Sequence, residues 1–290
     1  VIEIIVLLKL ECIKAFPDST CLLIFLLVVV FFAPVFLVAI LSFMAIPCFS
    51  QAESAFQEGE YLKFRVRYGI FNASYASLTL KNKTYQGKTV YHALGKGETT
   101  GLAKLFFKVD DTYESYFDKE TGKPYFFNRD IYEGGYTKKL NFLFNFDSNS
   151  VKIKNLENGE EKNMSVQPDI KDVISTLYYL RNNPKMNNLK KNDEVSMDMI
   201  FDDDEVYKFR LRFLGKEKVD TPLGEINTLI FRPLVQDGRV FKEQESLTLW
   251  ISDDENKIPV KIKASLRVGS LIGEIIHYNG LKHPTVLKKK

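Results

Sequence analysis

The sequence predicts a mainly β protein, in which a curved antiparallel sheet or partly open half-barrel wraps around one amphipathic helix and follows an N-terminal hydrophobic helix. Three observations lead to this prediction. Apolar and polar residues alternate strictly in several short segments, which is the period of a strand. One segment, 169–182, has its apolar residues at helical spacing instead. The stretch from Ser19 to Ala52 contains no charged residue.

The uncharged N-terminal stretch is long enough to cross a bilayer. Its centre, residues 21–46, is almost wholly apolar, and a transmembrane helix needs roughly 20 such residues. Pro47 would end that helix, and the small residues Ser50 and Ala52 suit cleavage by a signal peptidase. Residues 1–52 are therefore expected to be a signal peptide or an N-terminal membrane anchor, and we favour cleavage.

The charges on either side of this segment predict its orientation. Lys9 and Lys14 precede it and Glu53 follows it, and the basic side of such a segment tends to stay in the cytoplasm. We therefore expect export across the inner membrane of a Gram-negative-type bacterium, to the periplasm or the envelope, with inner-membrane anchoring if the segment is not cleaved. Residues 1–20 also carry acidic groups that are unusual in a signal peptide, so an alternative is that they form an upstream extension ahead of the true start.

The positions of the cysteines and the net charge exclude several kinds of site and partner for the remaining chain. All three cysteines lie at or before Cys48, so residues 53–290 cannot form a disulfide, a thiol nucleophile or a cysteine-ligated metal site. The formal net charge of the chain is +3, which is too small for bulk attraction to nucleic acid, and no nucleic-acid partner is expected. The last residues, 282–290, form a basic tail that we expect to be solvated.

Strict alternation identifies the strands of the exported part. In each case one face is apolar and the other is charged or polar, which is typical of an antiparallel sheet packed on one side and wet on the other. The segments are 61–68, 74–80, 140–146, 207–213 and 260–263.

One clear helix interrupts these strands. Its apolar residues follow the i, i+3, i+4, i+7 pattern from Asp169 to Asn182, and a weaker helical turn is expected over 101–108. We expect residues 53–281 to form a single β-rich domain, with two sheet halves, 53–165 and 185–281, on either side of the helix. A repeated pattern of strand, acidic turn, Pro and strand before and after the helix favours these two halves.

Several short motifs, in order along the chain, carry a family likeness. They resemble the domain of unknown function 3108 family of bacterial exported proteins, over about residues 58–281. The resemblance implies a periplasmic or envelope-associated protein with no established activity. The motifs are Glu58-Gly59-Glu60-Tyr61, Asp110-Asp111-Thr112-Tyr113, Glu133-Gly134-Gly135-Tyr136, Asp172-Val173-Ile174-Ser175, Thr221-Pro222-Leu223-Gly224 and Lys257-Ile258-Pro259-Val260.

A more distant likeness concerns the fold. The units of strand, acidic turn, Pro and strand are similar to those of the periplasmic lipoprotein carrier and receptor proteins, LolA and LolB. That resemblance implies a half-barrel sheet over helices with an apolar ligand cavity. Because unrelated functions share folds, it does not by itself assign a function.

The sequence shows none of the common enzyme motifs. It contains no nucleophile elbow, phosphate-binding loop, dinucleotide fingerprint or zinc-protease motif, so no catalytic residue, cofactor or metal is expected and the protein is predicted not to be an enzyme. The acidic run 202–205 is predicted to be a hairpin tip, with calcium binding as the alternative.

Aromatic residues on the strand faces are the most informative functional signal. We expect a concave face larger than one helix can cover, whose surplus binds a lipid, a lipoprotein acyl chain or an envelope protein. One alternative is a structural or interaction module whose concave face is filled, and another is a hydrolase or transferase of an envelope polymer. The candidate ligand-binding residues are Tyr68, Tyr113, Tyr136, Phe142, Phe144 and Trp250.

Overall fold

The computed structural model describes residues 53–101, 103–203, 205–234, 247–266 and 269–287. All of them belong to one compact unit, Ala52–Lys290. The predicted signal or anchor segment lies outside the described residues. Within the described residues, no helix is long and apolar enough to span a bilayer.

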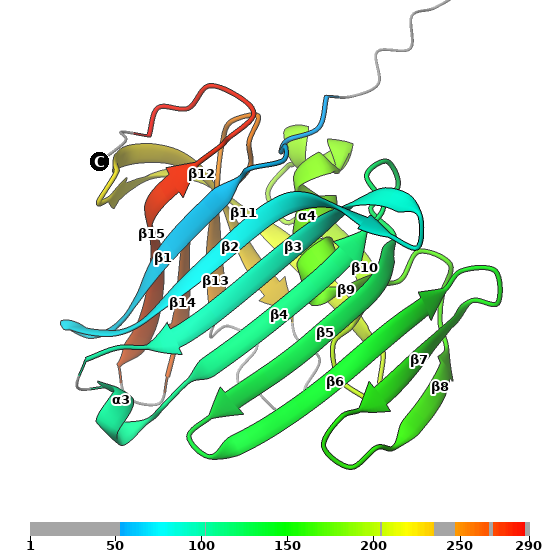
Figure 1. Ribbon diagram of the computed structural model, residues 1–290. Coiled ribbons are helices and arrows are strands. Elements are labelled where there is room, and N and C mark those ends of the chain that lie inside the picture. The colour runs from blue at the N-terminus through cyan, green and yellow to red at the C-terminus, as the bar shows by residue number, and fades with distance from the viewer. Residues whose placement is uncertain (1–52, 102, 204, 235–246, 267–268, 288–290) are drawn as a thin grey trace, which may run out of the picture. The chain divides into compact units, whose positions relative to one another are not determined.

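The described residues form one curved, unclosed antiparallel sheet of fifteen strands, which confirms the predicted mainly β half-barrel (Figure 1). The order β8-β7-β6-β5-β4-β3-β2-β1-β15-β14-β13-β12-β11-β10-β9 places the first half of the domain on one side and the second half on the other. Among the described strands, the short β9 alone pairs in parallel, with β10. The strands are β1 (Tyr61–Tyr68), β2 (Phe71–Tyr85), β3 (Lys88–Thr99), β4 (Asp110–Phe117), β5 (Pro124–Glu133), β6 (Tyr136–Asn145), β7 (Ser150–Asn155), β8 (Glu161–Ser165), β9 (Lys171–Asp172), β10 (Glu194–Ile200), β11 (Tyr207–Thr221), β12 (Gly224–Leu234), β13 (Leu247–Ser252), β14 (Pro259–Ser265) and β15 (Ser270–Asn279).

The alternation of β1 shows how the sequence selects the buried face. Leu62 is fully buried, and Phe64 packs partly against the same core. Arg65, between Phe64 and Val66, forms an ion pair with Glu274 of β15 on the opposite face. Neighbouring side chains therefore separate into a core face and a solvent-side face, as the period of two requires.

The long helix is shorter than its periodicity predicts. The structure has α4 at Val173–Asn182, whereas the prediction placed its start at Asp169. Asp172 instead caps the helix, and its carboxylate accepts hydrogen bonds from the backbone of Ile174 and Ser175, both at 2.8 Å. Lys171 and Asp172 form β9 and pair with β10. Ile170, just before them, is therefore buried without being helical. A cap with non-helical backbone ends the helix on its N-terminal side whatever the spacing of the apolar residues.

The described residues also include two shorter helices. The predicted turn over 101–108 is present as α3, and a 3-10 helix, η1, follows α4 directly. Their bounds are α3 (Ala103–Phe106) and η1 (Pro184–Asn187).

Helix α4 lies against the concave face of the sheet and fills one half of it (Figure 1). Tyr178 contacts Phe56 and Phe117 through ring centroids 4.7 and 5.3 Å apart, and all three side chains are buried. At the two edges of the curved sheet, Ile170 and Ile200 pack with the inward side chains of β5, β6 and β7 in a second core cluster. The β9–β10 edge therefore meets the far side of the sheet through side chains rather than through backbone hydrogen bonds.

A buried ion pair fixes α4 to the start of the domain. Arg181 and Glu60 form a two-armed pair at 2.6 and 2.7 Å, and both side chains are about 1% exposed. Arg181 also donates to the backbone carbonyls of Asn256 and Ala55. The charge is thus almost completely satisfied by partners, which a buried guanidinium requires.

The connection between β10 and β11 joins two antiparallel strands, as predicted for a hairpin tip, and its described residues Asp202 and Asp203 lie against the concave face. Asp202 accepts a hydrogen bond from Arg129 at 2.9 Å and another from Lys138, and Asp203 is 2.7 Å from the Lys138 ammonium. Two of its carboxylates are therefore engaged by cations of β5 and β6.

Candidate functional site

The concave face is divided into a half covered by α4 and a half that extends toward α3. Two glycines of β3 mark the boundary. A Cβ at Gly95 would lie 3.4 Å from Ile174 of α4, whereas a Cβ at Gly97 would meet nothing closer than the Asp111 Cβ, at 3.9 Å. We call the part beyond Gly95 the open half.

One side of the open half is an apolar strip on β1, β14 and β15. Val66 pairs with Gly273, which pairs in turn with Ile262, so the two side chains flank a position that has no side chain. Tyr68, opposite Leu271, continues the same face toward the end of the sheet. Ile262 is 42% exposed and Tyr68 is 41% exposed, whereas Leu62, on the same face under α4, is fully buried. The strip therefore has the composition of a core, but the described residues cover it only in part.

The other side of the open half is a charged strip on β4, β5 and β6. Asp111 lies opposite Gly97, Arg129 lies opposite Tyr113, and Lys138 lies opposite the buried Ile131. Arg129 is 9% exposed, and its Nε is buried without a hydrogen-bond partner. An inward guanidinium thus keeps one donor that no described residue accepts.

The pKa values of the two buried acidic groups at this strip, Asp111 and Asp202, are shifted in opposite directions. Burial, opposed by a hydrogen bond from the Tyr132 amide and reinforced by Glu133, raises the pKa of Asp111 to about 6. Burial would also raise the pKa of Asp202, but hydrogen bonds from Lys138, the Asp203 amide and Arg129 outweigh it and lower that pKa to about 2. Near neutral pH the strip therefore combines a firmly ionised carboxylate with one that is easily protonated.

The open half contains three of the six predicted ligand-binding residues. Tyr68, Tyr113 and Tyr136 all lie on the concave face, at β1, β4 and the start of β6. Burial raises the pKa of Tyr113, which packs partly against the second core cluster. Tyr136, opposite Glu133, is largely exposed at the end of the sheet.

The other three predicted residues lie elsewhere. Phe142 is fully buried against Phe127 and belongs to the core. Phe144 stacks with Phe146 beside a hollow of about 750 Å³ at the opposite end of the strands. Trp250 lies opposite Lys261, whose ammonium is 5.3 Å from the indole ring, and its N–H donates to Glu217.

The sequence did not identify Arg129, Lys138 or Ile262 as site residues. Each follows the correct period for an inward position, but so do the many core residues on the same strands. An inward charge within an apolar face is the signal that was available for Arg129 and Lys138. For Ile262 no local signal existed, because its exposure depends on where α4 ends.

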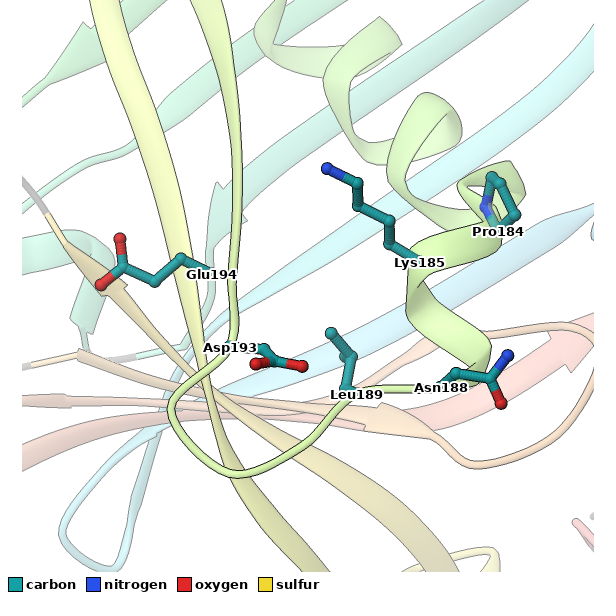
Figure 2. Close-up of a pocket in the computed structure, with 6 residues that line it drawn as sticks. All are labelled: Pro184, Lys185, Asn188, Leu189, Asp193 and Glu194. Atoms are coloured by element: carbon teal, nitrogen blue, oxygen red, sulfur yellow. The ribbon is translucent and has the colours of Figure 1, made fainter.

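A second hollow, of about 530 Å³, lies between η1 and the turn that leads into β10 (Figure 2). Pro184 and Lys185 lie on one side of it, and Asp193 and Glu194 on the other. Both acids are already engaged, Asp193 by the Lys190 amide and Glu194 by Arg212. In the part of the chain that the structure describes, no group of three or more histidines, cysteines and acids is arranged to hold a metal ion.

Three solved structures are similar to this chain, and the first of them supports the fold. A β-barrel-like protein of the domain of unknown function DUF1849 from Brucella abortus is similar at 9% identity and a TM-score of 0.52, covering 77% of this chain and 98% of that one. A putative exported protein with a YmcC-like fold from Bacteroides fragilis is similar at 8% identity and a TM-score of 0.32, with 77% and 97% covered. A DUF1089 family protein from Pseudomonas aeruginosa is similar at 11% identity and a TM-score of 0.35, with 76% and 97% covered.

The family comparison covers most of the described domain. No curated protein matches the chain. The family model described as a protein of unknown function, DUF3108, matches residues 63–276, which span β1 to β15. The chain therefore belongs to the DUF3108 family.

Proposed function

We propose that the protein is a non-enzymatic binding protein of the bacterial envelope, which holds a lipophilic or lipid-linked ligand on the open half of its concave face. The observation that carries this proposal is the partial exposure of Val66, Tyr68 and Ile262, which continue the core face beyond α4. Inward apolar side chains without a full cover favour an apolar ligand, because each gains transfer free energy when water leaves it.

The charged strip extends the proposal from an apolar to an amphiphilic ligand. An acyl chain would lie along β1, β14 and β15, and a hydrogen-bonding headgroup would face β4 and β5. Arg129 has an unpaired buried donor there, and Asp111 can donate when it is protonated. A ligand with one apolar and one polar end would use both sides of the open half.

Export to the envelope is part of the same proposal. It is supported by the apolar segment 21–46 and by the absence of cysteine from residues 53–290. A protein that holds a lipid outside the cytoplasm needs an apolar surface shielded from water, and a curved sheet provides one without closing into a full barrel.

A dye-binding measurement on matched variants tests the apolar strip. The probe is N-phenyl-1-naphthylamine, an uncharged lipophilic dye whose fluorescence rises in apolar surroundings. Ile262→Glu places a charge in the strip and is expected to weaken dye binding by at least about tenfold, since burying a charge beside the ligand is costly. The control is Leu143→Glu, because Leu143 is 41% exposed, much as Ile262 is, but lies on the opposite face of the sheet.

Equal dye binding by the two variants would contradict the proposal. Native mass spectrometry of the protein purified from its host envelope provides the second readout. A stoichiometric lipid that Ile262→Glu loses and Leu143→Glu retains supports the binding function. A lipid-free mass for the wild-type protein, together with no dye binding, would instead favour the structural or interaction module.

A further inference from the structure

Three connections at the α3 end of the sheet expose large apolar side chains. Ile70 lies in the turn between β1 and β2 and Phe71 begins β2. Leu105 and Phe106 lie in α3, and Tyr136 follows the turn between β5 and β6. Ile70 and Phe106 are each 87% exposed. Because β1, β3 and β5 all run toward this end, the three connections lie along one edge of the antiparallel sheet (Figure 1). We call these residues, with Phe107, the apolar rim.

Backbone contacts join the three connections into one surface. The Thr100 amide donates to the Ala73 carbonyl at 3.2 Å, and the Gly134 amide donates to the Lys108 carbonyl at 2.8 Å. The Phe107 ring occupies the space that a side chain at Gly134 would need, since a Cβ there would lie 2.2 Å from it. Gly134 also has a φ of +58°, which a glycine adopts freely. The rim is therefore held in place by the fold although its side chains face water.

Two lysines lie within the rim. The connecting segments 69–72, 100–108 and 134–137 contain Lys104 and Lys108 and no Asp or Glu, and the acidic residues beside them, Glu98, Asp110 and Glu133, lie at the adjoining ends of β3, β4 and β5. The Lys108 ammonium lies 4.8 Å from the Tyr132 ring, beside the exposed aromatic residues. Exposed aromatic and aliphatic side chains flanked by lysine are the composition of a surface that binds at the interface of an anionic bilayer.

We propose that the apolar rim docks on the surface of a bilayer that contains anionic phospholipid, with Phe71 and Phe106 inserted at the level of the headgroups. Removal of these side chains from water supplies the attraction, and the two lysines favour the anionic lipid. The rim borders the end of the open half at Tyr68, so docking would bring that face to the membrane. The docking itself needs no ligand in the open half, and it stands or falls separately from the binding function.

Tryptophan quenching in the full chain tests the docking. The chain has a single tryptophan, so Trp250→Phe removes the background and Phe106→Trp introduces a reporter in the rim. Vesicles of phosphatidylethanolamine and phosphatidylglycerol with brominated acyl chains quench a tryptophan that inserts. The control reporter is Val286→Trp, which is 73% exposed and lies beside the start of β12 and the end of β13, away from the rim. Both reporters keep the N-terminal segment, so association through residues 21–46 is common to them.

Stronger quenching at position 106 than at position 286 supports the docking. In the double variant Phe71→Ser/Phe106→Ser, compared by vesicle flotation with the wild-type chain carrying the same N-terminal segment, partitioning is expected to weaken by at least about tenfold, the loss that follows from about 1.4 kcal/mol. No quenching at position 106 would overturn the proposal. If the same double variant abolishes a concentration-dependent dimer in sedimentation velocity while position 106 stays unquenched, the rim is an interface between two copies instead.

Discussion

The covered and open halves of the concave face are built from the same strands, but they differ in how far their buried polar groups are paired. Under α4, Arg181 and Glu60 are buried together and each oxygen of the carboxylate receives a donor. In the open half, Arg129 keeps an unpaired buried donor, and Asp111 shifts toward its neutral form. The first arrangement minimises the cost of burying charge, whereas the second keeps groups that a ligand can still engage. The difference agrees with our proposal that the surface beyond α4, and not the surface beneath it, holds a ligand.

Breaking the buried ion pair between Arg181 and Glu60 should cause the largest loss of stability. Arg181→Ala leaves Glu60 buried without its main partner, and we expect the free energy of unfolding to fall by about 3–5 kcal/mol. Urea denaturation followed by circular dichroism measures it. Lys218→Ala is the control, because Lys218 pairs with Glu225 on the surface, where an ion pair contributes little to stability. Similar losses for both variants would mean that α4 is not held by this pair.

The two glycines of β3 test the boundary between the halves. Gly95→Val adds methyl groups toward Ile174, and we expect a loss of about 1–2 kcal/mol from overpacking. A Cβ at Gly97 has no atom of α4 within 4 Å, so Gly97→Val should be neutral or slightly stabilising, because valine is favoured in strands. Thermal unfolding of the two variants side by side gives the difference. A destabilised Gly97→Val would show that the open half is covered after all.

Substitution of Asp111 should change the stability least, and the size of the change should depend on pH. Its pKa is raised in the folded state, so its contribution to stability is complete below about pH 4 and is lost as the pH rises through about 6. Asp111→Asn keeps the oxygen that accepts the Tyr132 amide and never ionises. The full shift corresponds to roughly 3 kcal/mol, and partial exposure reduces our expectation to about 1 kcal/mol of added stability at pH 7.5.

Urea titrations of wild type and Asp111→Asn at pH 4 and pH 7.5 measure this difference. The gain should disappear at pH 4, where the wild-type carboxyl is largely protonated. A gain of equal size at both pH values would point to packing rather than to ionisation.

The local patterns of the sequence predicted the strands well. The segments 61–68, 207–213 and 260–263 all lie within observed strands, because alternation reports directly which side chains share a face. The start of α4 was predicted less well. Ile170 has the right spacing for the helix, but its backbone neighbours pair with β10, a contact that no local pattern contains.

The candidate site was predicted only in part for the same reason. Tyr68 and Tyr113 could be assigned to the concave face from the period of their strands. Phe142 has an equally good pattern, yet it is buried by Phe127 and by residues far away in the chain. Arg129 is held at the candidate site by its hydrogen bond to Asp202, which lies 73 positions further along the sequence.

The sequence by itself determined which side chains face inward, where the long helix of the described domain falls, and that residues 53–290 lack cysteine. These properties depend on the period of the backbone and on composition, which need no knowledge of distant contacts. Only the tertiary structure decided that α4 covers Gly95 and stops short of Gly97, and hence that Val66 and Ile262 stay partly exposed. The segments that bury a sheet face are remote in the sequence, and the local alternation of residues does not indicate where those segments end.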